Sequence, residues 1–355
     1  MTSKELVHAA LNGQPTPRVP TGPLAVHFCA EVAGYTLRQY TTDAQALADS
    51  VIRYYERFRP DAVWLSADTW VSAQAMGACV GATDDHQPFG GLGEPLVQTA
   101  ADIDRIPSPE VATQGRYPLM LEALSRIVSA LGKDVFIVAC FDQYPFSLAA
   151  ALMGINEIML KLHDDPGFVR ALMARCEAYA LAYGQALSQT GADMLSGGDS
   201  PAGLIGPQPY AEIALPAEKR LIGKLKSATG KPVSLHICGH ATRILPLMAA
   251  SGADVLELDH AVDLGEACRI VGPDLGLWGN LDPVRVLAQG TPTEVWAEAH
   301  SVLAAIQAAG HRRFVLSSGC TLPVETPYQN LEALLHPGNR SSAWAASGDG
   351  CVTAE

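Results

Sequence analysis

The sequence predicts an α/β fold, a single (β/α)8 barrel with a helical extension at its N-terminus. Short apolar runs alternate with longer amphipathic stretches along almost the whole chain, the pattern of βαβ units and a parallel sheet. Eight such runs can be counted, and eight parallel strands close a barrel. An open doubly wound sheet is the alternative, but no G-x-G-x-x-G follows the first run.

The elements follow in order along the chain. The predicted strands are 24–29, 62–66, 135–141, 192–196, 233–238, 255–258, 275–278 and 314–317. The predicted helices are 43–59, 118–131, 155–162, 166–190, 210–229, 241–251 and 292–309. Gly191, Gly252 and Gly310 stand just past three of these helices, where glycine commonly ends a helix.

Three segments lie outside this alternation. A helix at 4–11 is expected to pack outside the barrel. Residues 76–117 are rich in Gly, Pro and Asp, which indicates a long loop suited to a lid or to substrate contacts. The barrel is expected to span residues 1–335, and the Gly/Ser/Ala-rich tail 336–355 to be flexible.

Composition restricts the possible partners. A formal net charge of −13 argues against nucleic acid and against an anionic membrane surface. No apolar run approaches the roughly 18 residues that a membrane span needs. Eight cysteines without a secretory leader indicate a cytoplasmic protein, in which Cys and His more often hold metal than form disulfides.

Polar residues gather where barrel enzymes keep their chemistry, at the C-terminal ends of the predicted strands. Any one of them could be an ordinary loop or capping residue, but seven strand ends share the bias. They are Asp68, Asp142, Asp199, His236 with Cys238, Asp259 with His260, Asn280 with Asp282, and Cys320.

Three of these residues predict a metal site. His236 and Cys238 lie two apart in a predicted strand, so their side chains share one face. Cys320 follows another strand, and the ends of strands can meet across a narrow barrel mouth. A His/Cys/Cys set leaves the fourth position of zinc open for chemistry. The alternative is that these are buried core residues, which is common for single Cys and His.

Several longer motifs resemble the uroporphyrinogen decarboxylase superfamily, and its methyltransferase branch more than the decarboxylase itself. The resemblance covers roughly residues 3–335. It is carried by DAVWLSADTWVSAQAMG (61–77), PFSLAAALMGINEIMLKLHDDPGFV (145–169), the HIC segment with GADVLELDH after it, GNLDP (279–283) and GHRRFVLSSGCTLPVETPYQNLEAL (310–334).

This resemblance implies a (β/α)8 barrel and a zinc-dependent methyltransferase. The H-x-C…C zinc site of the branch maps onto His236, Cys238 and Cys320. Zinc would bind a thiol, or another group to be alkylated, as its anion. A cobalamin held on a separate corrinoid protein would donate or accept the methyl group. No motif selects among the methyl donors and acceptors that the branch uses.

Further site residues come from the same comparison and from the strand ends. Asp68 matches an aspartate with which the decarboxylases hold pyrrole nitrogens, and Asp68 and Asp199 are the candidate catalytic groups. Candidates for substrate binding are His27, Glu94, Asn280 and Asp259, with Glu94 in a GEP sequence that the methyltransferase branch often shows. Glu257 and Asp259 could supply a fourth ligand or a hydrogen bond to His236.

Two alternatives remain open. One is a metal-independent decarboxylase that uses Asp68, although Glu31 and Tyr35 occupy the arginine positions of that enzyme's R-Q-A-G-R motif. An acidic residue there would repel a polycarboxylate such as uroporphyrinogen. The other is a non-catalytic barrel that binds a corrinoid.

Overall fold

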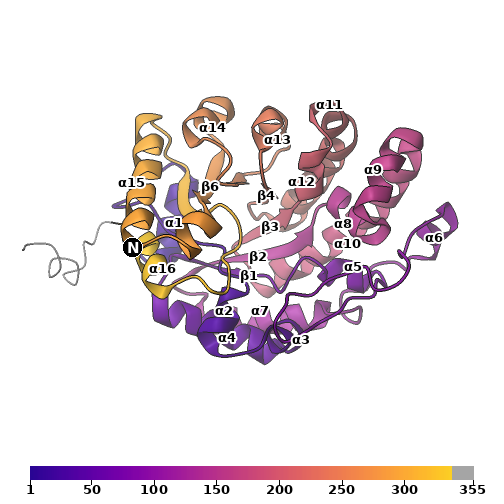
Figure 1. Ribbon diagram of the computed structural model, residues 1–355, viewed down its shortest axis with the longest axis horizontal. Coiled ribbons are helices and arrows are strands. Elements are labelled where there is room, and N and C mark those ends of the chain that lie inside the picture. Colours follow the sequence, from indigo (N-terminus) through magenta and orange to yellow (C-terminus); the bar gives the residue numbers. More distant parts are fainter. Residues whose placement is uncertain (338–355) are drawn as a thin grey trace, which may run out of the picture.

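A seven-stranded parallel sheet, ordered β1 to β7 along the chain, forms the centre of the molecule, and helices surround it (Figure 1). The computed structural model describes residues 1–337. The strands are β1 Ala62–Leu65, β2 Phe136–Gln143, β3 Met194–Gly198, β4 Ser234–Ile237, β5 Val255–Leu258, β6 Gly276–Leu281 and β7 Phe314–Ser318. The predicted barrel-like α/β architecture is confirmed, with seven of the eight predicted strands in their places.

The predicted first strand, 24–29, is wrong. The chain instead passes between β7 and β1 at Pro20–Gly22: Gly22 N–H donates to the Leu316 carbonyl, and Asp61 N–H donates to the Thr21 carbonyl, each at 2.9 Å. Thr21 and Leu316 form an isolated parallel bridge. Pro20 and Pro23 flank this bridge and lack the N–H groups that a longer ladder needs. The apolar run that follows is buried in a turn and a helix, which an apolar run alone does not distinguish from a strand.

The helices agree with the predicted ranges within a few residues. The longer ones are α4 Ala44–Phe58, α7 Tyr117–Leu131, α9 Ile155–Asp164, α10 Pro166–Thr190, α12 Leu215–Thr229 and α15 Pro292–Ala308. The shorter ones are α1 Ser3–Leu11, α2 Phe28–Ala33, α3 Leu37–Thr42, α5 Val71–Ala75, α6 Ala100–Arg105, α8 Pro145–Met153, α11 Pro207–Pro209, α13 Leu245–Ala249, α14 Leu264–Val271 and α16 Tyr328–Leu335. The predicted helix 210–229 begins with a π-helical turn, Tyr210–Ala214, before α12.

Helix α1 covers the end of the barrel at which the strands begin. Val7 is fully buried in one apolar cluster with Trp64 and Trp278, whose side chains come from β1 and β6. Lys4 N–H donates to the carbonyl of Asp134, just before β2, at 2.8 Å. The predicted helix is thus confirmed. It lies outside the sheet and covers the N-terminal ends of the strands. The opposite end, where the strands finish, is the end at which barrel enzymes carry their active sites.

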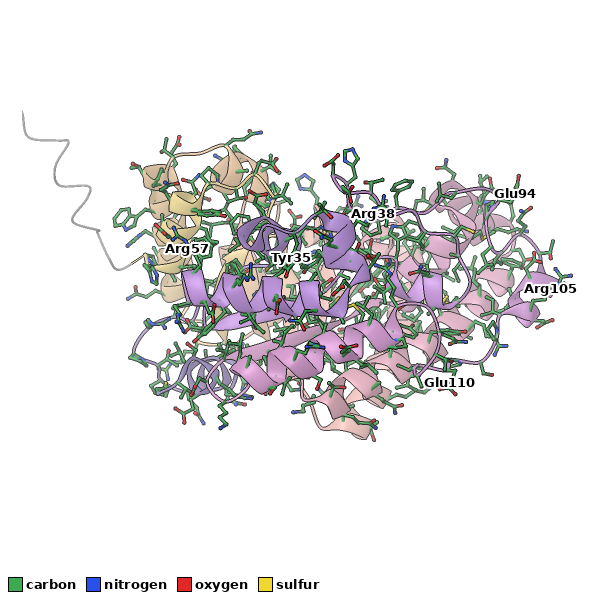
Figure 2. The ribbon with its side chains drawn as sticks, turned by 90° about the horizontal axis from the view of Figure 1, so that it is seen from below. Tyr35, Arg38, Arg57, Glu94, Arg105 and Glu110 are labelled. Carbon is green, nitrogen blue, oxygen red and sulfur yellow. The ribbon has the colours of Figure 1, made fainter. Side chains whose placement is uncertain are left out.

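The segment between α5 and α7 is the long loop that the sequence predicts. Its only regular pieces are α6 and an isolated antiparallel bridge between Gly81 and Phe89. Figure 2 shows Glu94, Arg105 and Glu110, all carried by this segment, together at one end of the molecule. Most of the predicted flexible tail, 336–355, lies outside the described residues.

Within residues 1–337, no single helix is long and apolar enough to cross a membrane. Helices α8 and α9 reach that length and composition only when taken together, and they meet at a bend of 111°.

Candidate metal centre

The three predicted metal ligands converge at the C-terminal end of the sheet. His236 lies on β4, Cys238 follows that strand directly, and Cys320 follows β7. His236 Nε2 lies 2.8 Å from Cys238 Sγ, and Cys238 Sγ lies 3.4 Å from Cys320 Sγ. All three donor atoms lie within 4.8 Å of one another. One cation of the size of zinc can therefore contact all three.

A glycine allows Cys320 to reach this position. Strands β5 and β6 separate β4 from β7, so the two strand ends meet only if the chain after β7 crosses close to the chain after β5. A Cβ atom at Gly319 would lie 2.4 Å from the main-chain nitrogen of His260. Gly319 N–H also donates to the Leu281 carbonyl at 2.7 Å. Only glycine permits this approach, which places the next residue, Cys320, beside Cys238.

The ring of His236 is oriented by the neighbouring strand. Its Nδ1 donates to the main-chain oxygen of Glu257 at 3.1 Å, which leaves Nε2 to face the two thiols. Such a contact fixes the tautomer that a metal-binding histidine needs. The carboxylate of Glu257 lies farther from Nδ1, at 3.8 Å, and accepts the hydroxyls of Ser196 and Ser234. The contact predicted from Glu257 to His236 is thus made through its main chain.

In the metal-free protein, contacts among the three groups shift the pKa of each. Burial lowers the pKa of His236, but contacts with Cys320 and Glu257 outweigh it and raise that pKa to about 9. The hydrogen bond from Cys320 lowers the pKa of Cys238. The same contact, with burial, raises the pKa of Cys320 to about 12. Cys238 is therefore the thiol that ionises first, and a cation bound here would displace the remaining protons.

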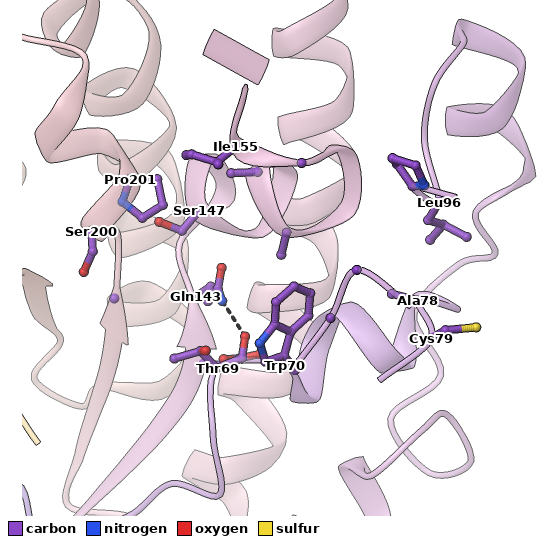
Figure 3. Close-up of a pocket in the computed structure, with 18 of the residues that line it drawn as sticks. Thr69, Trp70, Ala78, Cys79, Leu96, Gln143, Ser147, Ile155, Ser200 and Pro201 are labelled. Atoms are coloured by element: carbon purple, nitrogen blue, oxygen red, sulfur yellow. Dashed lines mark hydrogen bonds between the residues drawn. The ribbon is translucent and has the colours of Figure 1, made fainter. Parts of the chain in front are cut away.

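A pocket of about 820 Å³ opens beside the centre, with Cys238 and Gly239 in its wall (Figure 3). The long loop between α5 and α7 supplies one side of this pocket, including Cys79 and Glu94. Its other side comes from the strand ends and from α8. The labelled side chains of Figure 3 show how Trp70 and Gln143 reach into the same space.

Asp68, predicted to be catalytic, is engaged in a buried ion pair. Both of its carboxylate oxygens accept from the guanidinium of Arg116, at 2.9 Å for the Nη2–Oδ1 contact. Oδ1 also accepts the N–H of Trp70 at 2.7 Å. The Arg116 side chain is 10% exposed and that of Asp68 1%. Asp68 does not line the pocket.

Asp199, the second predicted catalytic residue, lies behind the pocket wall. It is fully buried, and Oδ1 accepts both the N–H and the hydroxyl of Ser147, at 2.7 and 2.6 Å. Its main-chain N–H donates to the His236 carbonyl at 2.8 Å. Burial raises the pKa of Asp199 to about 6, and its neighbour Glu218 is raised well above its usual pKa. Asp199 thus ties α8 to the strand that carries His236.

Of the four predicted substrate-binding residues, only Glu94 lines the pocket. His27 Nε2 donates to the Ala67 carbonyl at 2.7 Å. The Asn280 amide donates to the Asp259 carbonyl at 3.0 Å, and Asp259 Oδ1 lies 2.9 Å from His260 Nδ1. These three side chains have partners within the protein.

Several pocket residues were not among the predicted site residues. Thr69, Trp70, Gln143, Ser147 and Ser200 line the pocket, and Ser200 Oγ accepts the N–H of Cys238 at 3.3 Å. The strand-end rule could have found Gln143 and Ser200, since both lie within two positions of a strand's end.

Asp142 lies at a predicted strand end but is not among the predicted site residues. It lines the pocket, and burial raises its pKa to about 7 although its Oδ2 accepts the Ser72 N–H.

Comparison with known proteins gives one family. The profile of the family described as uroporphyrinogen decarboxylase (URO-D) matches residues 2–338. The methylcobamide:CoM methyltransferase MtbA of Methanosarcina mazei is 30% identical over 343 residues, covering 94% of this chain and 96% of that protein. A uroporphyrinogen decarboxylase of Carboxydothermus hydrogenoformans is also 30% identical, over 281 residues, covering 78% and 77%.

A solved structure described as a methyltransferase from Methanosarcina mazei has the same fold. It superposes with a TM-score of 0.85 at 24% identity, covering 95% of this chain and 98% of that one.

Proposed function

We propose that this chain, which belongs to the uroporphyrinogen decarboxylase (URO-D) family, is a methyltransferase that moves a methyl group between a corrinoid and a thiol held at a zinc ion. Relatives that match over nearly their whole length are named methylcobamide:CoM methyltransferases, so both the corrinoid and the thiol have a precedent among them.

The observation that carries this proposal is the convergence of His236, Cys238 and Cys320 at the wall of a pocket. One imidazole and two thiolates are donors that zinc prefers, and three protein ligands leave its fourth position for a substrate. The residues fit the ion in two further respects. Among the described residues, His236 Nε2 contacts only the thiols, and its Nδ1 donates to the Glu257 carbonyl.

Zinc at this site would hold a substrate thiol as its anion at neutral pH, where a free thiol is mostly protonated. The protein's own groups would position that thiolate. His236 keeps one ring orientation because of Glu257, and Ser200 holds the main chain at Cys238. Asp199 links the strand of His236 to Ser147 in the pocket wall.

The corrinoid would be presented by a separate corrinoid protein. Methyl transfer requires the methyl carbon and the accepting sulfur to come into close contact. The pocket at the C-terminal end of the barrel is the route to Cys238, so the partner would dock over this mouth.

A metal-independent decarboxylase receives less support, although decarboxylases are among the relatives. Asp68, the residue on which that activity would depend, has both oxygens bound by Arg116 and does not line the pocket. A non-catalytic corrinoid-binding barrel would not need three convergent ligands for a metal.

The test is a methyl-exchange assay with the zinc-loaded full chain, free methylcobalamin and a panel of small thiols, followed by the change in cobalamin absorbance. We expect thiol-dependent loss of methylcobalamin that stops when the metal is removed and returns with zinc. A wild-type protein that stays folded and fully active without metal would reject the proposal.

A further inference from the structure

We propose that the thiol substrate of this pocket carries a hydrogen-bond donor, ammonium or hydroxyl, at its far end and no anionic group. This inference rests on the proposed function and names its substrate class. It sets the chain apart from relatives named for coenzyme M, a thiol that ends in a sulfonate.

The first observation is the unpaired oxygen of Gln143. This side chain is 9% exposed and lies at the end of β2. Its amide nitrogen donates to the Thr69 carbonyl, and its Oε1 has no hydrogen-bond partner. The contact with Thr69 fixes the amide orientation, because the reversed amide would place two acceptor oxygens together. Figure 3 shows the Gln143 oxygen turned away from Thr69, toward the space below Ser147.

The second observation is the charge of the pocket wall. Its carboxyl groups are those of Glu94 and of Asp142, which burial keeps protonated up to about pH 7, and the described residues that line the pocket include no Lys or Arg. Asp142 is 4% exposed, and its Oδ1 also has no hydrogen-bond partner. Above about pH 7, where Asp142 is ionised, two residues that line one pocket therefore each have an acceptor oxygen without a donor from the protein.

Arg116, whose positive charge favours the ionised form of Asp142, is not available to bind an anionic substrate group. Arg116 directs its guanidinium nitrogens to Asp68, to the side chain of Gln74 and to the Thr41 carbonyl. Its charge is neutralised by Asp68, and it does not line the pocket.

These groups suit a donor and oppose a sulfonate. A buried acceptor without a partner is costly, and a substrate N–H or O–H would satisfy it. A negatively charged substrate group would meet carboxylates and a carbonyl oxygen instead, and like charges in contact strongly disfavour binding. An ammonium group can donate to the Gln143 oxygen and is attracted by the carboxylates of the pocket wall. A hydroxyl can only donate, and a sulfonate can do neither.

Three thiols that differ only at the far end test this inference: 2-aminoethanethiol, 2-mercaptoethanol and 2-mercaptoethanesulfonate. In each reaction the thiolate sulfur forms a bond to the methyl carbon of methylcobalamin. The cobalt–carbon bond breaks with its electron pair staying on the corrinoid, and the thiol proton goes to the buffer. With the zinc-loaded full chain at about pH 8, where Asp142 is ionised, and after subtraction of the rate without protein, we expect kcat/KM to fall in that order, by about tenfold or more from first to last.

Variants assign the preference to the pocket. Gln143→Lys should shift the ratio of ammonium to sulfonate thiol by about tenfold toward the sulfonate. Gln307→Lys, the same change on the exposed face of α15, should leave the ratio unchanged. If Gln143→Lys does not fold, Gln143→Met removes the acceptor without adding charge and should weaken the preference for the ammonium thiol.

The outcomes separate the two proposals. Equal rates for the three thiols, or a preference for the sulfonate, in a protein that exchanges methyl groups would overturn this inference and leave the proposed function standing. Failure of the zinc-loaded protein to exchange methyl groups with any thiol would overturn the proposed function and this inference with it.

Discussion

Cys238 Sγ and Cys320 Sγ lie 3.4 Å apart, although 82 positions separate the two residues in the chain. The distance exceeds a disulfide bond of about 2.05 Å, and both cysteines are free. His236 Nε2 completes the group from the other side of Cys238. Two thiols and one imidazole brought together from different strands form a set of donors for a metal, and the predictions below follow from this arrangement and from the ion pairs around it.

Cys320→Ser should abolish metal binding and leave the fold intact. It removes one of the three proposed zinc ligands, at a half-buried position just after β7. We expect about one zinc per chain in the wild type and close to none in the variant, with loss of methyl transfer. Metal analysis and circular dichroism measure both properties. Cys79→Ser, at an exposed cysteine outside the ligand group, is the matched control and should keep its zinc.

Zinc should stabilise the folded wild type by mass action. A ligand that binds only the native state at about 100 times its Kd raises the free energy of unfolding by about 2.7 kcal/mol. Urea unfolding of the metal-free protein, with and without added zinc, measures this difference. In Cys320→Ser, added zinc should raise the free energy of unfolding very little. An equal gain in the variant would place the zinc elsewhere.

Asp68→Asn should destabilise the protein without stopping methyl transfer. The change leaves the buried guanidinium of Arg116 without its counter-charge, and breaking a buried pair in this way costs about 3 to 5 kcal/mol. Urea unfolding measures the loss. Glu122→Gln, at an exposed pair with Arg126, should change stability little.

The activity of Asp68→Asn distinguishes the proposed methyltransferase from an enzyme that uses Asp68 in catalysis. Because Asp68 does not line the pocket, turnover per folded molecule should persist at temperatures where the variant remains native. Methyl transfer that disappears in a fully folded Asp68→Asn protein would show that this carboxylate takes part in the reaction.

Asp142→Asn should alter the pH dependence of stability. Burial raises the pKa of Asp142 to about 7, so the folded state holds a proton that the unfolded state releases from about pH 4 upward. The wild type therefore loses stability as the pH rises from about 4 to 7. Asparagine does not ionise and can still accept the Ser72 N–H, so the variant should lack this part of the loss.

The measurement for Asp142→Asn is urea unfolding of both proteins, saturated with zinc, between pH 5 and 8. Stability of the variant minus that of the wild type should increase with pH up to about 7 and then level off, and the increase over this range should be up to about 2.7 kcal/mol. A difference that stays constant would show that Asp142 is ionised throughout this range, and one that falls with pH would also contradict a raised pKa for Asp142.

Much of the fold follows from local patterns. Seven strands and the long helices were predictable because apolar runs and amphipathic periods report local conformation directly. The predicted first strand at 24–29 was wrong, because this run is buried as a turn and a helix, and a buried apolar run has the same sequence pattern in a helix as in a strand. Closure of the barrel depends on Thr21 meeting Leu316, a contact that no local pattern encodes.

The chain's sequence by itself determined which potential metal donors lie at the same end of the barrel. His236 and Cys238 share a strand face because side chains on a strand alternate with period two, and Cys320 follows a strand in the same parallel sheet. Strand ends of a parallel barrel lie at one mouth, so the convergence of these three side chains was predictable from their order and spacing, and their assignment as zinc ligands stays a prediction.

Only the tertiary structure decided which strand-end groups remain available to a substrate. Asp68 follows β1 and Gln143 ends β2, but Asp68 meets Arg116, 48 positions away, and is neutralised. Gln143 meets only an acceptor at Thr69 and keeps its oxygen unpaired. The reason is physical: a polar group's availability depends on the charges and donors that distant segments bring to it, and these distances exist only after folding.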